Sequence, residues 1–338
     1  MIFMKVGIIT QPLLNNYGGI LQNLALQTAL KKLSHDSITV DHVHQASFFD
    51  YLLSWGKTAL LRLVGKKRPF AKIKVPLCRK KEFDDFVQLH IKKTEMLNCV
   101  SSVSKKKYQL DALIVGSDQV WRPAYNYSLK DMYLDFCKKK KTLKRISYAA
   151  SFGVDEWEYT PKQTKVCATL AKKFDEISVR EESGVKLCKD HLGVEAAWVL
   201  DPTLLLKKED YCELCKDVPF SNEKFIAAYV LDMNETVRLQ CENIASEMGL
   251  VLKMFSADSK STLTVPEWLA MFRDASYVVT DSFHGTVFLI IFVKEFKCIY
   301  NKSRGSARFD SLLKLYNSGK LEEMREFLIN WLKKALEN

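Results

Sequence analysis

The sequence lacks any segment long and apolar enough to cross a membrane. Its longest apolar run, residues 286–293, is far shorter than the ~20 residues that a membrane-spanning helix needs. The first residues lead straight into an apolar, strand-like segment, without the basic region, longer apolar stretch and cleavage site of a secretory signal. We therefore expect a cytoplasmic protein.

A disulfide framework and a dedicated metal site are also not indicated. The nine cysteines are odd in number and scattered in spacing. Cys212 and Cys215 form the only C-x-x-C pair, and a zinc site would need a second pair or nearby histidines. Two cysteines one turn apart on a helix are the ordinary interpretation. The sequence has no Walker loop, no H-E-x-x-H and no G-x-S-x-G elbow.

Acidic residues are too few to balance the basic ones, and the formal net charge is +11. Much of the excess lies in residues 57–81 and 138–145. Such runs usually form solvated faces, but they also suit an anionic membrane surface or a phosphorylated acceptor. Nucleic acid is not expected, because no recognised binding motif or basic-aromatic platform is present. Leucines and Trp55 in and before the first run fit an amphipathic helix, either at the inner membrane face or packed on the protein.

What the sequence does contain is a regular alternation of short apolar segments and longer helical patterns. This alternation predicts βαβ units and largely parallel sheets, and 338 residues suit two domains. Asp201-Pro202 interrupts the pattern, and a polar, irregular stretch follows to about Glu223. We expect an α/β fold of two Rossmann-like domains facing across a cleft. The first, residues 1–205, has a basic helical insertion at about 48–81, and the second, 206–338, ends in two closing helices.

The predicted strands are Lys5–Thr10, Ser37–His42, Leu110–Val115, Arg145–Ala150, Glu176–Val179, Ala197–Leu200, Lys224–Leu231, Leu250–Phe255, Tyr277–Thr280 and Phe296–Tyr300. The predicted helices are Ile20–Leu33, Glu82–Lys92, Pro161–Phe174, Glu235–Met248, Pro266–Asp274, Thr286–Phe292, Ala307–Tyr316 and Leu321–Leu336. In open parallel sheets, ligands bind beyond the carboxyl ends of the strands. The polar residues that follow the strands are therefore the candidates for a site.

The first predicted strand leads to a loop that contains Tyr17, Gly18 and Gly19. Paired glycines let the backbone approach a ligand closely, and the following helix offers N–H groups to an anion. The alternative is a tight loop without a ligand, since the six-residue dinucleotide fingerprint is absent.

The third predicted strand ends in a segment that contains Ser117, Asp118, Gln119 and Trp121. At this position Asp118 suits a general base or an acceptor for a sugar hydroxyl, and Trp121 suits stacking on a sugar ring. The alternatives are a helix-capping aspartate and a core tryptophan. The next strand ends in a small polar loop at Ser151.

Arg180 follows the fifth predicted strand, where a helix begins. Its rigid fork of N–H donors suits a carboxylate or a phosphate, whereas an ordinary salt bridge with Glu181 or Glu182 explains it equally well.

The most distinctive segment is Thr280-Asp281-Ser282-Phe283-His284-Gly285-Thr286, between an apolar strand and an apolar helix. Ser282, His284 and the N–H groups of Gly285 and Thr286 are expected to converge on the helix N-terminus. The result is an anion site beside a titratable imidazole. The alternative is a histidine with a structural role.

Together these segments resemble the polysaccharide pyruvyl transferase family, and they follow the family's order over roughly residues 5–310. They are Asn16-Tyr17-Gly18-Gly19-Ile20-Leu21-Gln22, Gly116-Ser117-Asp118-Gln119-Val120-Trp121, Ser147-Tyr148-Ala149-Ala150-Ser151-Phe152-Gly153, Ser178-Val179-Arg180, Leu200-Asp201-Pro202-Thr203 and Thr280-Asp281-Ser282-Phe283-His284-Gly285-Thr286.

The resemblance implies a GT-B-like fold and transfer of pyruvate from phosphoenolpyruvate to two sugar hydroxyls, giving a cyclic ketal without a redox cofactor. The acceptor is a sugar of a surface polysaccharide or of its precursor, such as a lipid-linked oligosaccharide. By resemblance, Arg180, Ser282, His284 and Gly285 bind the donor. His284 also passes protons, and Asp118 orients or deprotonates a hydroxyl. The residues expected at the cleft or acceptor are Tyr17, Gly18, Gly19, Ser117, Gln119, Trp121, Ser151 and Asp281.

One departure from the family pattern matters. Members tend to have Arg-Leu-His where this chain has Ser282-Phe283-His284. The missing cation is supplied by another residue, such as Arg304 or Arg308, or the donor differs. Two alternative functions follow: a GT-B-type glycosyltransferase that uses a sugar nucleotide, and a non-catalytic carbohydrate-binding or scaffold protein.

Overall fold

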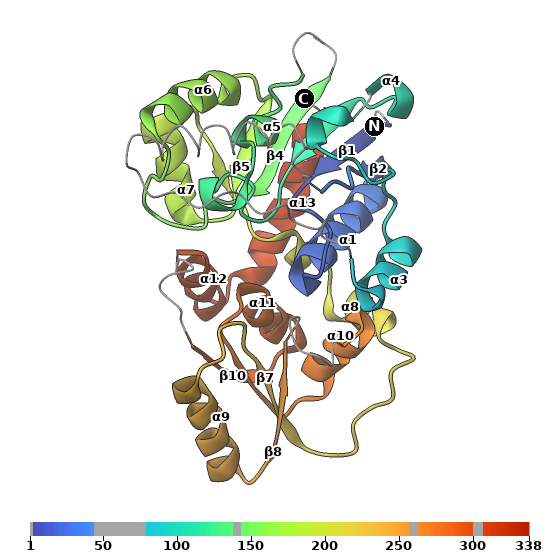
Figure 1. The fold of residues 1–338 in the computed structure, drawn as a ribbon, viewed down its shortest axis with the longest axis vertical. Coiled ribbons are helices and arrows are strands. Elements are labelled where there is room, and N and C mark those ends of the chain that lie inside the picture. The colour runs from blue at the N-terminus through green and yellow to red at the C-terminus, as the bar shows by residue number, and fades with distance from the viewer. Residues whose placement is uncertain are drawn as a thin grey trace, which may run out of the picture.

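The computed structural model describes residues 3–43, 79–103, 105–137, 143–256, 263–299 and 307–337. Two parallel sheets, each with its own helices, lie one above the other along the long axis of the molecule (Figure 1). The expected α/β class with parallel sheets is confirmed. The predicted insertion at about residues 48–81 lies almost entirely outside the described residues.

The first sheet has six parallel strands in the order β2-β1-β3-β4-β5-β6. Their bounds are β1 (Lys5–Ile9), β2 (Asp36–Thr39), β3 (Ala112–Val115), β4 (Lys144–Ala150), β5 (Glu176–Val179) and β6 (Ala197–Trp198). The helices along this part of the chain are α1 (Tyr17–Lys32), α3 (Lys81–His90), α4 (Lys105–Tyr108), α5 (Leu129–Met132), α6 (Pro161–Ala171) and α7 (Glu182–Leu187), with short turns η1 (Val100–Ser102), η2 (Pro123–Tyr125), η3 (Cys188–Leu192) and η4 (Pro202–Leu205).

The second sheet has four parallel strands in the order β10-β9-β7-β8. Their bounds are β7 (Phe225–Tyr229), β8 (Val251–Phe255), β9 (Tyr277–Thr280) and β10 (Glu295–Cys298). The remaining helices are α8 (Lys208–Leu214), α9 (Glu235–Met248), α10 (Val265–Asp274), α11 (Phe283–Phe292), α12 (Ala307–Asn317) and α13 (Leu321–Glu337).

Burial explains why the central strands are apolar throughout. All four residues of β3 and all five of β7 are buried, as expected for parallel strands covered on both faces. The edge strand β10 instead alternates between exposed and half-buried residues. Continuous apolar runs therefore identify the middle of each sheet.

Several helices differ from the sequence-based prediction, and two of the differences have a clear physical reason. α11 begins at Phe283 rather than Thr286, because the Ser282 side chain caps it by accepting a hydrogen bond from the Gly285 N–H. α8 lies inside the stretch expected to be irregular, and it is held by Tyr211, which is fully buried. Seven residues with mostly polar side chains give too weak a periodic signal to reveal such a helix.

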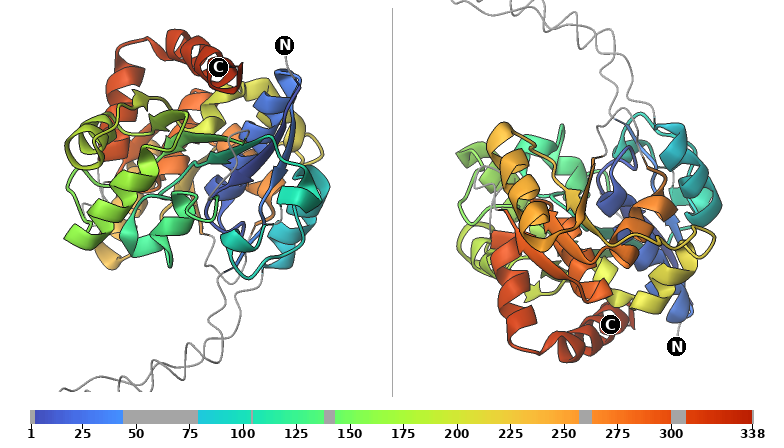
Figure 2. Two further views of the ribbon diagram at one scale, coloured as in Figure 1. Left: turned by 90° about the horizontal axis from the view of Figure 1, so that it is seen from above. Right: turned by 90° about the horizontal axis from the view of Figure 1, so that it is seen from below.

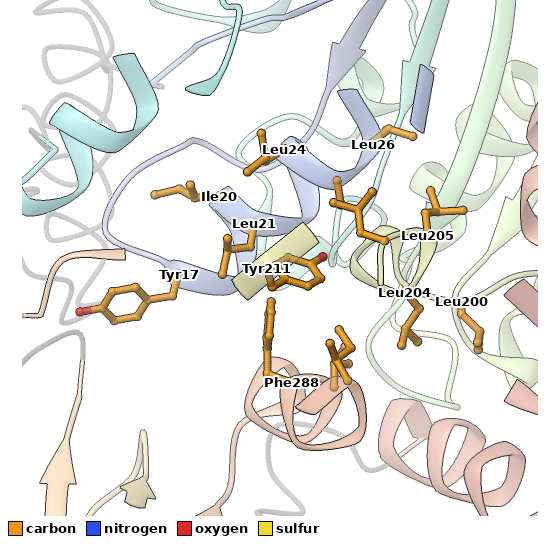
Figure 3. Close-up of a cluster of buried hydrophobic side chains, with 14 of the residues drawn as sticks. Tyr17, Ile20, Leu21, Leu24, Leu26, Leu200, Leu204, Leu205, Tyr211 and Phe288 are labelled. Atoms are coloured by element: carbon orange, nitrogen blue, oxygen red, sulfur yellow. The ribbon is translucent and has the colours of Figure 1, made fainter. Parts of the chain in front are cut away.

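The two domains share one apolar core, in which residues from both sides pack together (Figure 3). Tyr17 of α1 stacks on Trp268 of α10 with ring centroids 5.1 Å apart, and its hydroxyl donates to the Leu263 carbonyl at 2.6 Å. Tyr211 of α8 meets Phe288 of α11 edge to face at 4.9 Å. The domains are thus joined by packed side chains as well as by the chain itself.

The last helix, α13, returns from the second domain to the first, and both ends of the chain lie at the first domain (Figures 1 and 2). Trp331 packs against Tyr148 of β4, and the Lys144 ammonium donates to the Leu336 carbonyl at 2.6 Å. This helix therefore covers the first sheet, although it was expected to close the second domain. None of the helices in the described ranges is both long and apolar enough to span a membrane.

The shared core predicts that Phe288→Ala destabilises the whole protein. Removing this fully buried ring, which contacts both Tyr211 and Trp268, leaves a cavity and should lower the free energy of unfolding by about 3–5 kcal/mol. Urea unfolding measures the change. Phe327→Ala is the control, because that ring on α13 is 44% exposed and should cost well under half as much. Equal effects of the two variants would contradict this account of the core.

Candidate functional site

Polar side chains from both sheets meet where the strands end. Asp118 follows β3, Arg180 follows β5, Asp201 follows β6 and His284 lies in the first turn of α11 after β9. The carboxyl ends of parallel strands share one edge of each sheet, and the two edges face each other here. The candidate site is therefore built from both domains.

Arg180 lies between two carboxylates at the centre of the site. Its guanidinium donates to Asp201 at 2.8 Å and to Asp118 at 3.1 Å, and its side chain is only 1% exposed. Burial alone would lower the pKa of Arg180, but the charges of Asp118 and Asp201 raise it above its ordinary value. Arg180, which was predicted to bind the donor, therefore pairs with two aspartates. It does not line the cavity described below.

Asp201 connects this ion pair to His284. Burial alone would raise its pKa, but the charges of His284 and Arg180 and the hydrogen bond from Thr203 lower it well below the ordinary value. One Asp201 carboxylate oxygen lies 3.5 Å from His284 Nε2, an ion-pair distance too long for a well-formed hydrogen bond. The other accepts from the Thr203 hydroxyl at 2.7 Å. Asp201 is therefore anionic and fixed beside the imidazole.

Gly18 provides the space that His284 occupies. A Cβ atom at residue 18 would lie 2.1 Å from the Cγ and Nδ1 atoms of the imidazole. At Gly19 the nearest atom would be 3.3 Å away, in the Asn16 side chain. The first glycine of the pair is thus required for contact between the domains, while the second is not.

A cavity of about 270 Å³ opens in front of this group, between the two domains. It is lined by Asn15, Asn16, Gly18, Asp118, Gln119, Tyr125, Tyr229, Leu231, Asp281, Ser282, Phe283, His284, Arg308 and Phe309. A larger cavity of about 470 Å³ lies elsewhere, beside Lys172 and Glu195, near the amino ends of β5 and β6. The smaller one contains the strand-end residues and is the candidate site.

Arg308, in the first turn of α12, brings a second guanidinium to the site and lines the cavity. The Phe283 ring lies 5.3 Å from the Arg308 guanidinium and 4.7 Å from that of Arg180. Burial and the charge of Arg180 lower the pKa of Arg308 to about 10, so it stays cationic at neutral pH. Arg308 gives the cavity a positive group suited to an anion.

Glu181 differs from Asp118 and Asp201 in that its pKa is raised rather than lowered. It is completely buried, and burial raises its pKa although the Arg180 side chain lies 4.0 Å away. The Ser151 hydroxyl donates to it. Ser151 is itself buried, behind the cavity wall rather than on it.

Two predicted cleft residues belong to the core, and these predictions are wrong. Trp121 is fully buried, stacks on Tyr133 at 4.8 Å and donates its indole N–H to the Met132 carbonyl. Tyr17 is 1% exposed and serves the domain interface. Neither ring can stack on a sugar, because other side chains already cover it.

The expected anion site at the N–H groups of Gly285 and Thr286 is also wrong. Gly285 N–H donates to the Ser282 hydroxyl at 3.2 Å, and Thr286 N–H donates to the Ser282 carbonyl at 2.9 Å. A glycine is needed at residue 285, since a Cβ there would lie 2.4 Å from the Thr280 hydroxyl. The helix start is thus closed by its own cap, with the side chains of Ser282, Phe283 and His284 on the cavity wall.

The other predicted residues divide between the cavity wall and the layer behind it. Gln119 and Asp281 line the cavity, and the Asp281 carboxylate accepts from the N–H groups of Leu231 and Asp232 at 2.7 and 2.9 Å. Ser117 is buried and its hydroxyl lies 3.3 Å from Asp201, to which it donates. Gly19 lies in α1 without forming part of the wall.

Sequence reasoning missed the roles of Asp201 and Tyr125. The signal for Asp201 was present, because this residue directly follows the sixth predicted strand. Arg308 was named only as a substitute cation, and the structure places it on the wall. Arg304 lies outside the described residues. Among the described residues, no group of three His, Cys, Asp or Glu side chains is arranged to hold a metal ion.

The fold and the inter-domain site define a GT-B-like architecture. A protein assigned as UDP-N-acetylglucosamine 2-epimerase from Listeria monocytogenes is similar with a TM-score of 0.50 at 11% identity, over 97% of this chain and 91% of that one. The structure of MnaA from S. aureus, solved with UDP, is similar with a TM-score of 0.47 at 12% identity, over 95% of this chain and 90% of that one. No curated protein sequence matches. The polysaccharide pyruvyl transferase profile matches residues 16–303, so the chain belongs to that family of transferases.

Adjacent glycines allow a direct test of the His284 environment. Gly18→Ala should displace the imidazole, because the new methyl group overlaps it, and should cost about 1–3 kcal/mol of stability. Gly19→Ala is the matched control and should change neither the position of the His284 ring nor the stability of the protein. The His284 ring signals in a ¹H–¹³C NMR spectrum report its position. An unshifted His284 signal in Gly18→Ala would contradict this packing.

The low pKa of Asp201 predicts a pH-dependent stability. Its contribution is fully present above the unfolded-state pKa of about 4 and is lost as pH falls toward the folded-state value. Asp201→Asn should therefore be less stable than wild type by about 3–5 kcal/mol at neutral pH. This difference in the free energy of unfolding between wild type and variant should become smaller below pH ~4, by at most about 1.4 kcal/mol per pH unit.

Urea unfolding at several pH values measures the gap. Asp85→Asn, at an exposed position on α3, is the control and should show little difference from wild type at any pH. A gap for Asp201→Asn that stays constant down to pH ~2 would show that Asp201 is not held as a carboxylate in the folded protein.

Proposed function

We propose that the protein transfers pyruvate from phosphoenolpyruvate to two hydroxyls of a sugar, forming a cyclic ketal, in the cavity between its domains. Membership of the family supports a pyruvyl transfer. The observation that carries the proposal is that Arg308 and His284 line the same cavity, in which a phosphorylated, carboxylated donor needs cationic and proton-donating groups.

Arg308 supplies the charge that the Ser282 position lacks. The family arginine would stand in the first turn of α11, and here that turn carries Ser282 and Phe283 instead. Phe283 contacts Arg308, so the aromatic ring that replaces leucine also supports the new cation. We infer that Arg308 binds the phosphate or carboxylate of the donor. Its guanidinium has the geometry for bidentate contact with either group.

His284 is the proposed proton donor. Protonation of the donor's methylene carbon leaves positive charge at the neighbouring carbon, to which a sugar hydroxyl adds and then loses its proton. Phosphate leaves with the ester oxygen, and the second hydroxyl closes the ring at the same carbon and loses its proton. The donor's double bond gains one proton, phosphate takes the second, and there is no net oxidation or reduction. The reaction therefore needs no redox cofactor.

The aspartates have separate proposed roles. Asp118 lines the cavity, and the charges of Arg180, His284 and Arg308 lower its pKa although burial alone would raise it. A carboxylate stabilised in this way is a weak base, so Asp118 accepts and orients a sugar hydroxyl. Asp201 lies behind the wall and acts as a positioning residue: its carboxylate lies 3.5 Å from His284 Nε2 and holds the imidazole in place.

We infer that the acceptor is a sugar of a surface polysaccharide or of its lipid-linked precursor, and that the protein acts in the cytoplasm. The basic run at residues 57–81 supports action at the inner membrane face, where such precursors carry phosphates. Ser282 favours one other candidate, a glycosyltransferase with a sugar-nucleotide donor, because it removes a cation from the site that the family uses for phosphoenolpyruvate.

Phosphoenolpyruvate should raise the melting temperature of the purified protein. At ~100 times its dissociation constant, it would stabilise the fold by about 2.7 kcal/mol. Arg308→Ala and His284→Ala should each lose most of this shift. Arg238→Ala is the matched control, since this exposed arginine pairs with Glu242 on α9, outside the cavity.

The same assay separates the alternatives. A rise in melting temperature with a uridine or cytidine sugar nucleotide, together with no change at millimolar phosphoenolpyruvate, would refute pyruvyl transfer. It would instead support a glycosyltransferase. Binding of acceptor glycan without turnover of any donor would instead indicate a non-catalytic protein. Release of phosphate from phosphoenolpyruvate in the presence of acceptor would support the pyruvyl transfer.

A further inference from the structure

A second, smaller cavity adjoins the candidate active site. Its volume is about 190 Å³, and it lies in the first domain between the loop after β1 and the segment from η2 to α5. Tyr125 belongs to the walls of both cavities, so the two spaces meet at this side chain. Nothing in the proposed donor chemistry uses the second cavity.

Two tyrosines at this place are unusually exposed. Tyr125 is 51% exposed and Tyr127 is 69% exposed, and both line the second cavity. Among the other aromatic residues that the structure describes in the first domain, more than half are buried in its core, as Trp121 and Tyr133 are. Partly exposed aromatic side chains beside a cavity are a common feature of binding sites.

The loop that presents these rings is firmly braced. The Arg122 guanidinium donates to both Glu158 carboxylate oxygens at 3.1 Å and to the Gln119 side chain at 3.1 Å. The Asn126 amide donates to the Gln119 and Arg122 carbonyls at 3.0 and 2.7 Å, and the Gln11 amide donates to the Asn126 side chain at 3.1 Å. Binding here would thus require little ordering of the loop.

The ring of Tyr125 is partly covered. The Arg122 guanidinium lies 5.2 Å from its centroid, yet half of the residue is still exposed. Apolar side chains, among them Leu14, Val43 and Met132, form part of the cavity wall, and the polar groups of Ser128 and Asp131 lie at the same wall. The cavity therefore offers an aromatic edge, an apolar surface and hydrogen-bonding groups together.

We propose that this second cavity binds a pyranose ring of the acceptor glycan, with Tyr125 and Tyr127 packing on its C–H faces. A pyranose has the matching chemistry, since its faces carry C–H groups and its rim carries hydroxyls. A glycan that binds in the second cavity and extends past Tyr125 would place its next sugar in the donor cavity. The role as acceptor subsite rests on the proposed function, whereas sugar binding itself does not.

The test uses the full-length protein and the methyl glycosides of glucose, galactose, mannose and N-acetylglucosamine. Saturation-transfer NMR should show binding of at least one of them to the wild-type protein, with the strongest signals on ring C–H protons. Tyr125→Ala and Tyr127→Ala should each weaken that binding by about fivefold or more. Tyr125→Phe and Tyr127→Phe keep the rings and should retain it.

The control is Phe220→Ala, which removes an equally exposed ring in the loop before β7 of the second domain and should leave binding unchanged. Failure of all four glycosides to bind the wild-type protein would overturn the proposal. Binding that survives both tyrosine-to-alanine changes would also overturn it, because the rings would then not form the contact.

The outcomes separate this inference from the proposed donor. Glycoside binding that depends on the tyrosines, in a protein that does not respond to phosphoenolpyruvate, would support the sugar subsite and refute pyruvyl transfer. A response to phosphoenolpyruvate with no tyrosine-dependent glycoside binding would support the donor site and refute the subsite. Joint binding, without displacement of one ligand by the other, would support both.

Discussion

The buried ion pairs of Arg180 with Asp118 and Asp201 fix the positions of the other groups at the site. A buried guanidinium that loses one partner leaves an uncompensated charge, which costs about 3–5 kcal/mol. The three residues follow three different strands of the first sheet, so the requirement for pairing holds these strand ends in register. Asp201 extends the group to His284 of the second domain. The same charges that arrange the strand ends thus also join the two halves of the site.

The contact between the domains is specified by shape as well as charge. Tyr17 and Gly18 are neighbours at the start of α1, and each contacts the second domain differently. Tyr17 packs into the shared core beside Trp268, while Gly18 leaves the space that the His284 ring fills. An error of one ångström at either contact would move the imidazole relative to Asp118. The apolar core beside the cavity therefore contributes to the geometry of the candidate site as well as to stability.

The sequence predicted the strands well because β3, β7 and β9 are short apolar runs that must be buried in parallel sheets. It also located Asp118, Gly18 and His284, since position after a strand is a local property. It could not show that Trp121 points into the core, because periodicity does not decide which way a loop residue faces. The partners of Arg180 were hidden for a related reason: Asp118 is 62 residues away along the chain.

The replacement of the family arginine by Ser282 has a physical counterpart elsewhere in the site. Two arginines near one another repel, and the aspartates beside Arg180 and the Phe283 ring help to make a second guanidinium tolerable here. The lowered pKa of Arg308, about 10, records that repulsion together with burial. An arriving carboxylate or phosphate would relieve it. In the proposed function, Arg308 of α12 would therefore take the place of the cation that the family pattern puts at the start of α11.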